Sequence, residues 1–568
     1  MTNFEISRTL SRVAKVLSFK GVERKRITDI KILSMTVEGL PFELNPESLE
    51  RVEKYLLNKS YLKKILRDLV VYGKSEEIEI LLRDVPPSLL ELTRIPGVGG
   101  RTLKILYERF GVVDIYGLES VLKEGLLSRV KEIGLNGEEI IKKNINKYFK
   151  LKREFSLSTA ESLFRHIKDI LINYGAKRVE IAGSVRRKKE IVSNLNIVCE
   201  VENPTRFKKN LKGDASTIKF IARGDHIEFF YGDCEIPIKL LIVPKDYFGS
   251  ALLFFTGPRN FSNYLVSKGK DYGYKTLPPG YLWIKGEEKE IFNILGMQYI
   301  PPEVRERWKE YLDTKELLSN LNIKGDLHVH TNYSDGISSI YEIVSFARDM
   351  GYKYIGISDH TKDLKVVNGL NEKRLMKERL EVRKLQSKFP EIKILFGAEV
   401  NIRQDGSLDI QESALRELDF VIASIHYGFY LDREINTKRM IKAIRNPYVS
   451  IIGHPTGRKI GERERMNMRY DLIFKEAEKT GTIIEVNATN DRLDIDSNMA
   501  YDLRNREVLF SIGSDAHFAP QLHSLSNFGV FILRRALVSE NKVINTFNLD
   551  HLLEVLGRKR RNLNEDNN

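Results

Sequence analysis

The chain has 568 residues, too many for one ordinary hydrophobic core, so we expect several domains. Its hydrophobic fraction of 42% and charged fraction of 30% are typical of a soluble globular protein and exclude a disordered chain. No apolar run reaches about 18 residues, and the first residues lack an apolar signal segment, so we expect neither a membrane span nor a secretory signal. With only two cysteines, the chain has no disulfide framework, and a cytoplasmic or nucleoid-associated location is expected.

The positive charge is concentrated in one part of the chain. The net charge is +14, and residues 1–324 carry +13 of it, which leaves +1 for residues 325–568. A basic part joined to a near-neutral part predicts a region that binds a polyanion and a second region with another task. Charge alone also fits lysine-rich faces that bind nothing.

Secondary-structure patterns change twice along the chain. Residues 1–150 show helical spacing of apolar side chains, as in SLERVEKYLLNKSYLKKILRDLVVYG. From residue 178 short β-like runs follow, among them RVEIAGS, LNIVCEV and IKLLIV. After residue 325, apolar strands alternate with helical stretches. Repeated strand-then-helix units predict a parallel α/β barrel, whose functional groups come from the carboxyl ends of its strands.

Histidines and acids occupy the ends of these expected strands. Six of the ten histidines and three acids lie there: His328, His330, His360, His426, His454 and His517, with Asp335, Glu399 and Asp515. One such histidine would more often be a packed core residue, but six at successive strand ends are hard to explain by packing. Imidazole and carboxylate together suit Zn, Mn or Fe, and this number of ligands predicts two or three ions.

The segments DLHVHTNYSDG, SDH, GAEV, SIHYG, GHPTGR and SDAH resemble the polymerase-and-histidinol-phosphatase (PHP) domain family over residues 325–560. The resemblance implies a distorted (βα)7 barrel that hydrolyses phosphoesters, with all nine ligand positions filled. It implies one ion on His328, His330, Glu399 and Asp515, a second on Glu399, His426 and His454, and a third on Asp335, His360 and His517. Divalent Mn or Zn is expected first, with Fe or Co as alternatives.

Three further residues lie beside the expected ligands. Arg458 follows the His454 segment, and its guanidinium would match a phosphate as a clamp. A surface charge in the run GRKIGERER is the alternative for Arg458. Asp326 and Asp359 adjoin ligands, and we expect them to orient histidines from behind.

A glycine-rich turn lies between two expected helices at residues 92–102. Gly97 and Gly99 in IPGVGGRT, followed by Arg101 and Lys104, resemble a helix-hairpin-helix. In that motif backbone N–H groups meet a DNA phosphate without reading base sequence. A plain hairpin between two helices is the alternative.

The segments AGSVRRKK, FGSALLFFTG and YIPPEVRE resemble an X-family DNA polymerase over residues 1–315. Joined to a PHP domain, this matches the architecture of PolX proteins, and it implies an α+β palm and thumb in which Gly183, Ser184 and Arg187 hold a triphosphate. The expected domains are a small helical domain (1–88), a fingers-like helix-hairpin-helix region (89–150), a palm-like domain (151–250), a thumb-like domain (251–315), a linker (316–324) and the PHP domain (325–568).

The palm of that family presents three carboxylates that bind two magnesium ions. At the corresponding places this chain has Asn194, Asn196 and Lys239, which are poor ligands for a hard cation. Misalignment by a residue or two is the alternative, with nearby acids serving instead: Glu200, Glu202, Asp233 and Glu235. We favour loss of the polymerase site, because the two asparagines keep the one-apart spacing of the carboxylates.

These observations predict a metal-dependent DNA phosphoesterase, a 3′→5′ exonuclease or 3′-end-processing nuclease in repair, whose degenerate polymerase core binds DNA. Its partner would be DNA with gaps, nicks or damaged ends, the protein would act as a monomer, and no membrane would be involved. The alternatives are an active gap-filling polymerase with a proofreading barrel, a DNA-end-binding scaffold, and a small-molecule phosphatase.

Overall fold

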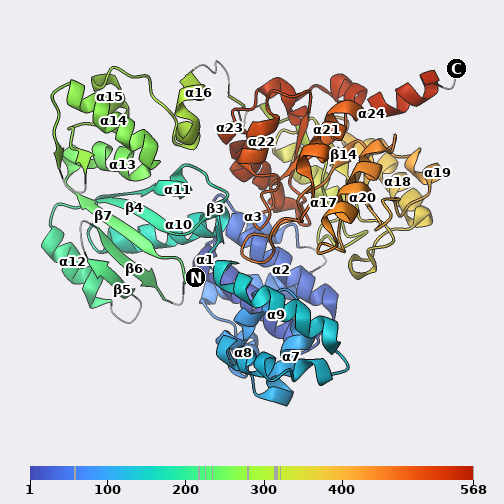
Figure 1. Ribbon diagram of the computed structural model, residues 1–568, viewed down its shortest axis with the longest axis horizontal. Coiled ribbons are helices and arrows are strands. Elements are labelled where there is room, and N and C mark those ends of the chain that lie inside the picture. The colour runs from blue at the N-terminus through green and yellow to red at the C-terminus, as the bar shows by residue number, and fades with distance from the viewer. Residues whose placement is uncertain are drawn as a thin grey trace. The chain divides into compact units, whose positions relative to one another are not determined.

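The computed structural model describes residues 1–56, 59–151, 153–214, 218–223, 226–232, 234–277, 280–312, 317–319 and 322–566. The chain forms two compact units (Figure 1). The first unit contains residues 1–152, 318–530 and 539–568, and the second contains residues 153–317 and 531–538. In the described part of the chain, no helix is both long and apolar enough to cross a membrane.

The first unit begins with a bundle of helices. Its main helices are α1 (Asn3–Phe19), α2 (Arg24–Gly39), α4 (Ser60–Arg67), α5 (Glu76–Arg83), α7 (Gly100–Phe110), α8 (Ile115–Lys123) and α9 (Gly134–Leu151). A capping box between Thr2 and Glu5 starts α1. Apolar residues of α1 at helical spacing, including Leu10, Val13 and Leu17, are buried. The helical expectation for this region is therefore confirmed.

The same unit contains a seven-stranded parallel barrel. Its strands, in spatial and chain order, are β10 (Gly325–Asp326), β11 (Tyr354–Ile357), β12 (Lys393–Asn401), β13 (Phe420–Ser424), β14 (Ile451–Ile452), β15 (Ile483–Asn487) and β16 (Phe510–Gly513). A parallel bridge between Val329 and Ala516, just past the ends of β10 and β16, brings the first and last strands together. The expected (βα)7 barrel is confirmed.

Helices surround these strands and fill one end of the barrel. The outer helices include α17 (Ile340–Asp349), α18 (Glu372–Gln386), α20 (Arg433–Arg445), α21 (Tyr470–Thr480) and α22 (Ser497–Leu503). Leu552 and Leu556 of α24 (Leu549–Asp566) join the strand residues Tyr354, Phe420 and Ile451 in one apolar cluster. The amino ends of the strands are thus closed by packing, which leaves their carboxyl ends for chemistry.

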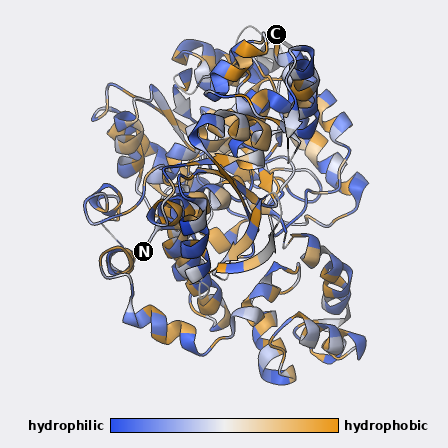
Figure 2. Cartoon of the chain, turned by 90° about the vertical axis from the view of Figure 1, so that its left-hand side faces the viewer, coloured by the Kyte–Doolittle hydropathy of each residue, from blue (hydrophilic) through white to orange (hydrophobic). Residues whose placement is uncertain are grey.

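The second unit is built on a five-stranded sheet of order β2-β4-β7-β6-β5. The strands are β2 (Arg178–Ala182), β4 (Leu195–Glu200), β5 (Ile218–Arg223), β6 (Ile227–Tyr231) and β7 (Ile238–Val243). Among the described strands of this sheet, only β4 and β7 pair in parallel. Helix α13 (Phe248–Thr256) packs on the sheet through Phe248, Ala251 and Leu252. Strands are largely hydrophobic, whereas helices mix hydrophobic and hydrophilic residues (Figure 2).

A short segment from the barrel's part of the sequence, Phe531–Val538, packs within the second unit. Arg534 pairs with Glu303 at 2.7 Å, and Arg535 pairs with Glu306 at 2.6 Å. These ion pairs explain why the segment separates from the neighbouring PHP-like sequence. The expected boundaries at 88, 150 and 250 remain predictions, and the expected linker 316–324 lies partly outside the described residues.

Candidate metal centre

The barrel brings all nine expected ligands to the carboxyl ends of its strands. Each ligand lies within or shortly after a strand, from His328 and His330 after β10 to Asp515 and His517 after β16. Three clusters have ligand atoms within 4.8 Å of one another: His330, Asp335, His360 and His517; His328, His330 and Asp515; and His360, Glu399 and His426. The clusters share His330 and His360, so they form one connected centre, and their members differ from the three expected ligand sets.

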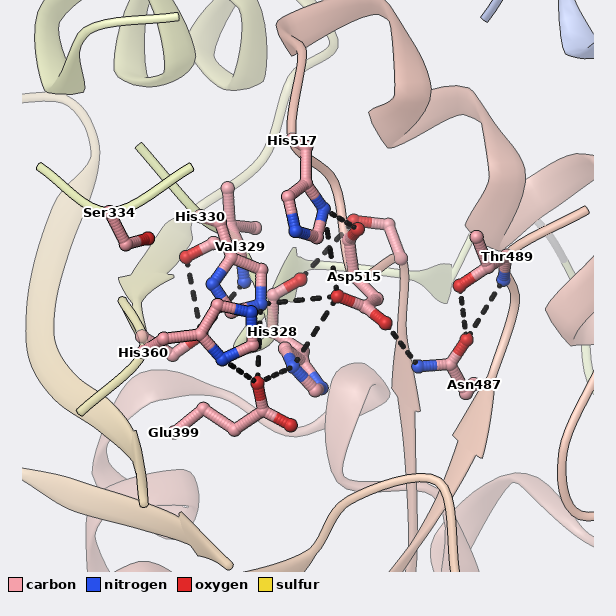
Figure 3. A network of polar contacts seen from close by, with 12 residues as sticks. His328, Val329, His330, Ser334, His360, Glu399, Asn487, Thr489, Asp515 and His517 are labelled. Atoms are coloured by element: carbon pink, nitrogen blue, oxygen red, sulfur yellow. Dashed lines mark hydrogen bonds and ion pairs between the residues drawn. The ribbon is translucent and has the colours of Figure 1, made fainter. Parts of the chain in front are cut away.

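Glu399 lies in the middle of this centre. Its side chain is fully buried, and Figure 3 shows the carboxylate beneath several imidazole rings. Its oxygens lie 2.8 Å from His360 Nδ1, 3.2 Å from His426 Nε2 and 2.9 Å from His454 Nε2. Glu399 therefore also ties His454, the ninth expected ligand, to the clusters.

The donor atoms fit divalent cations. Buried ring nitrogens of His328, His330 and His426 have no hydrogen-bond partner within the described residues. Leaving several buried polar atoms without a partner costs free energy, whereas nitrogen and oxygen lone pairs that converge on one space suit a metal ion. The residues therefore fit a cluster of bound cations.

Four ligands have the charge state that metal binding requires. Burial lowers the pKa of His330 and of His454 to about 4, so both rings are neutral at physiological pH. Burial opposes ionisation of Glu399 and Asp515, but neighbouring histidines hold the pKa of both carboxyls well below the ordinary range. Neutral imidazoles and anionic carboxylates are the ligand forms. At His328, His360 and His517 burial opposes protonation, but neighbouring carboxylates raise the pKa of the rings, and a bound cation would displace these protons.

Two ligands have backbone conformations that side chains rarely adopt. His454 has φ of +26° and Asp515 has φ of +52°. Residues other than glycine in this region store strain, which concentrates at functional sites. His454 follows Gly453, where a Cβ would lie 2.3 Å from Ser424 Oγ, so the turn requires glycine.

Two polar residues that the sequence analysis missed orient the ligand rings. His328 Nδ1 lies 2.5 Å from Glu485 Oε1, and the other oxygen of Glu485 accepts the backbone N–H of His454 at 2.6 Å. His426 Nδ1 lies 2.7 Å from Asn401 Oδ1. Such partners fix the ring orientation of metal-binding histidines. The signal in the sequence was a polar residue inside an apolar strand, as Glu485 is in TIIEVNA.

The two aspartates expected to orient histidines hold loop backbone and hydroxyl groups instead. Asp326 accepts the backbone N–H of His328 at 3.0 Å and the hydroxyl of Ser514. Asp359 accepts the N–H and hydroxyl of Thr331 at 2.9 and 2.6 Å, and it also bonds to Ser334. They shape the loops that carry His328, His330 and Asp335.

Arg458 and Arg492 have different surroundings. The guanidinium of Arg458 is directed into the protein, where it donates to the carbonyls of Arg492, at 2.8 Å, and Leu493. Arg492 Nε lies 3.7 Å from Asp515 Oδ2. Arg458 therefore holds the loop that presents Arg492 to the metal ligands, and these contacts do not support its expected role as a clamp.

The palm-like sheet brings together the three residues expected at the polymerase site. Asn196 on β4 is the register partner of Lys239 on β7, and Asn194 lies just before β4. Lys239 Nζ pairs with Glu228 Oε1 at 2.9 Å, and His226 Nε2 lies 2.7 Å from the same oxygen. Glu228, an acid that the sequence analysis did not single out, is therefore bound to a lysine and a histidine.

In the turn expected to bind a triphosphate, Arg187 already has protein partners. Gly183 has φ of +63°, and the Asn196 amide lies 2.5 Å from the position a Cβ would take there. Ser184 is partly exposed in the short helix α11 (Gly183–Arg186). Arg187 pairs with Glu306 at 3.3 Å and donates to the Thr256 carbonyl.

The expected helix-hairpin-helix turn lies in the first unit. Gly97 has φ of +99°, and Gly99 is the N-cap of α7. Arg101 and Lys104 are exposed on α7, where Lys104 pairs with Glu108 at 3.7 Å. Glycine therefore supplies the left-handed conformation that this turn needs.

The sequence is similar to known proteins over its whole length. Residues 326–489 match the PHP domain family. The chain is 30% identical over 574 residues to the DNA polymerase/3′-5′ exonuclease PolX of Bacillus subtilis (strain 168), which covers 98% of this chain and 99% of the relative. A probable phosphatase of Thermoanaerobacter sp. (strain X514) is 31% identical over 252 residues, which cover 42% of this chain and 96% of the relative. Among solved structures, Leishmania infantum polymerase beta in a ternary gap complex covers 46% of this chain and 99% of that chain, at 14% identity and a TM-score of 0.24.

The fold and the site define a protein with a PHP barrel joined to a polymerase X-like part. This agrees with the resemblance seen in the sequence. The chain belongs to the PolX family.

Proposed function

We propose that this protein hydrolyses phosphodiester bonds at DNA 3′ ends in a metal-dependent reaction, and that its polymerase core binds DNA without synthesising it. The observation that carries the proposal is the connected centre of nine buried or nearly buried ligands in the barrel. The relative in Bacillus subtilis is named a DNA polymerase/3′-5′ exonuclease, which supports DNA as the substrate.

The nine ligands would hold two or three divalent ions, with Mn or Zn expected before Fe or Co. Bound cations of this kind lower the pKa of a water molecule and neutralise phosphate oxygens. Arg492, beside Asp515, is placed to meet a phosphate oxygen with its guanidinium. Glu485 and Asn401 keep His328 and His426 in the orientation that metal binding needs.

Loss of polymerase activity is proposed from the charges of the palm. A pair of Mg²⁺ ions needs carboxylate oxygens, whereas Asn196 is neutral and its register partner Lys239 is cationic. Among the acids considered as substitutes, Glu200 lies four positions along β4 from Asn196, and Asp233 lies outside the described residues. Glu228 is nearer, but it is bound to Lys239.

The polymerase-like part would then deliver DNA with gaps, nicks or damaged ends to the barrel. Gly97, Gly99, Arg101 and Lys104 are proposed to contact a DNA phosphate through the turn before α7. Arg187 is a weaker candidate for a triphosphate contact, because Glu306 and the Thr256 carbonyl already bind its guanidinium.

Two other functions have a specific observation in their favour. The relative's name includes DNA polymerase, which favours an enzyme that also fills gaps. Several relatives of the barrel are named probable phosphatases, which favours a soluble phosphomonoester as substrate. The basic charge of residues 1–324 supports DNA over a small substrate.

The test compares DNA with a soluble phosphomonoester in the presence of Mn²⁺. We expect 3′-terminal nucleotides to be released from 5′-labelled single-stranded and gapped DNA, and little phosphate to be released from p-nitrophenyl phosphate. His328→Ala should abolish the release of nucleotides. Rapid hydrolysis of the phosphomonoester without DNA degradation would instead establish the phosphatase.

A further inference from the structure

The loop after β13 extends from the ligand His426 to helix α20 and carries an exposed aromatic side chain. Tyr430 is 60% exposed, although it lies only four residues after His426. Arg439 of α20 is buried and donates to the carbonyls of Tyr427 and Gly428 at 3.2 and 3.0 Å. The backbone of this loop is therefore fixed, while the Tyr430 ring is left open to solvent.

Phe429, which precedes Tyr430 in the chain, contacts a cation. The guanidinium of Arg463 lies 3.6 Å from the centre of the Phe429 ring. Arg463 also donates to the Gly457 carbonyl at 2.8 Å, three residues after the ligand His454. The loops after β13 and β14, each of which carries a metal ligand, are thus joined beside Tyr430.

Positive charge connects this aromatic loop to the metal centre. Burial and the neighbouring charge of Arg492 lower the pKa of Arg463 to about 10, a value at which Arg463 stays cationic at physiological pH. Arg492 in turn lies 3.7 Å from the ligand Asp515. Cations therefore lie both beside a metal ligand and against an aromatic ring, and positive charge with aromatic side chains is the combination that binds single strands.

We infer that Tyr430, next to the Arg463–Phe429 pair, is a platform on which the unpaired terminal base of single-stranded DNA stacks while its phosphodiester lies at the metal centre. This inference rests on the proposed nuclease function and deepens it. A terminal nucleotide that enters the metal centre separates from its neighbouring base, and an exposed aromatic ring replaces the stacking that the base then loses. Stacking on a π face is independent of base identity, so the platform implies digestion with little sequence preference.

The experiment uses full-length protein loaded with Mn²⁺ and compares Tyr430→Ala and Tyr430→Phe. Tyr341→Ala is the matched control, because Tyr341 is also exposed, at 52%, but belongs to helix α17 on the outside of the barrel. The substrates are 5′-labelled single-stranded DNA with an ordinary 3′-terminal base, the same DNA with a 3′-terminal abasic site, and bis(p-nitrophenyl) phosphate.

We expect Tyr430→Ala to raise KM for the ordinary DNA end about tenfold, in line with the loss of one base–aromatic stack. Tyr430→Phe should retain wild-type KM, since the ring is kept. The effect of Tyr430→Ala should vanish with the abasic end and with bis(p-nitrophenyl) phosphate, and the bound metal should be unchanged.

An unchanged KM of Tyr430→Ala on the ordinary end would overturn the platform while leaving the nuclease proposal intact. Equal losses on all three substrates would also overturn it, because a base platform cannot act on a substrate without a base. Wild-type protein that hydrolyses bis(p-nitrophenyl) phosphate but leaves DNA intact would overturn the proposed function and, with it, the platform.

Discussion

The barrel and the palm-like sheet both place polar side chains near paired parallel strands, yet their charges are opposite. In the barrel, nine strand-end positions carry histidine or acid, and Glu399 lies among the histidines. In the palm, neighbouring strands carry Asn196 and Lys239, and the cross-strand acid Glu228 is bound to that lysine. At the positions expected to bind cations, the chain therefore has histidines and acids in the barrel, and asparagine and lysine in the palm.

This difference shows that strand pairing and packing can be retained independently of the side chains at a site. The sheet of the second unit retains its strand pairing, its packed helix α13 and its glycine turn at Gly183. At the three positions where carboxylates were expected it has Asn194, Asn196 and Lys239. Family membership alone therefore cannot decide whether the palm is active, since activity depends on the particular side chains.

The largest expected effect comes from removing a barrel ligand. Asp515→Asn replaces an anionic ligand by a neutral amide, and we expect the rate of DNA hydrolysis to fall more than about 100-fold, since residues that only orient ligands already cost 10- to 100-fold. Asp349→Asn, an exposed change on α17, is the control. Measured metal content and hydrolysis rate should fall together, and a metal-free Asp515→Asn protein with wild-type activity would contradict the assignment.

The next test concerns the ion pairs that keep the palm's turn in place. Burial opposes ionisation of Glu306, but Arg535, Lys189 and Arg187 lower the pKa of its carboxyl from 4.5 to about 2. The anion therefore stabilises the fold above pH 4.5 by about 3 kcal/mol, and this contribution is lost as the pH falls toward 2.

Glu306→Gln should accordingly unfold at lower urea concentration at pH 7, and its deficit relative to wild type should shrink below pH 4.5. Both tryptophans, Trp283 and Trp308, belong to the second unit, so their fluorescence reports its unfolding. A deficit that stays constant down to pH 3 would show that Glu306 does not act through its charge.

A smaller effect on metal affinity is expected from replacing Glu485, whose carboxylate contacts His328 Nδ1. Glu485→Gln keeps the size of the side chain but weakens its bonds to His328 Nδ1 and to the N–H of His454. We expect metal affinity to fall 10- to 100-fold and excess Mn²⁺ to restore activity. Glu391→Gln, at an exposed surface position, should leave affinity unchanged. A loss that no concentration of metal restores would contradict a positioning role.

The smallest expected effect is a gain of Mg²⁺ binding and primer extension when carboxylates are introduced into the palm. Asn194→Asp, Asn196→Asp and Lys239→Asp together would restore carboxylates at three neighbouring positions. In an Asp515→Asn background, where the barrel no longer degrades the product, we expect weak Mg²⁺ binding by calorimetry and slow primer extension. Failure of the triple variant to bind Mg²⁺ would show that more than three side chains separate the palm from an active site.

Much of the barrel centre could be predicted from sequence because the ligands lie at or shortly after the carboxyl ends of apolar strands. Local pattern therefore fixed which end of the barrel holds His328, Glu399 and Asp515. Contacts between distant segments could not be predicted. The bond between His328 and Glu485 joins residues 157 positions apart, and the orientation of the Arg458 guanidinium depends on how the loop carrying Arg492 folds.

The palm shows the same limit. The resemblance to an X-family palm predicted that Asn194, Asn196 and Lys239 lie at one site, and the register of β4 and β7 places Asn196 beside Lys239. The pairing of Glu228 with Lys239 involves an antiparallel strand whose register the sequence did not specify. Likewise, nothing local predicted that Arg535 would pack among residues of the second unit.

The most direct test of the account is to incubate wild-type protein with a 5′-labelled gapped duplex, all four deoxynucleotides, and Mg²⁺ or Mn²⁺, beside Asp515→Asn. The account predicts that wild type shortens the labelled strand from its 3′ end without extending it, and that Asp515→Asn leaves the strand unchanged. Extension of the strand by Asp515→Asn would contradict the account, because the palm would then be binding catalytic metal despite Asn194, Asn196 and Lys239.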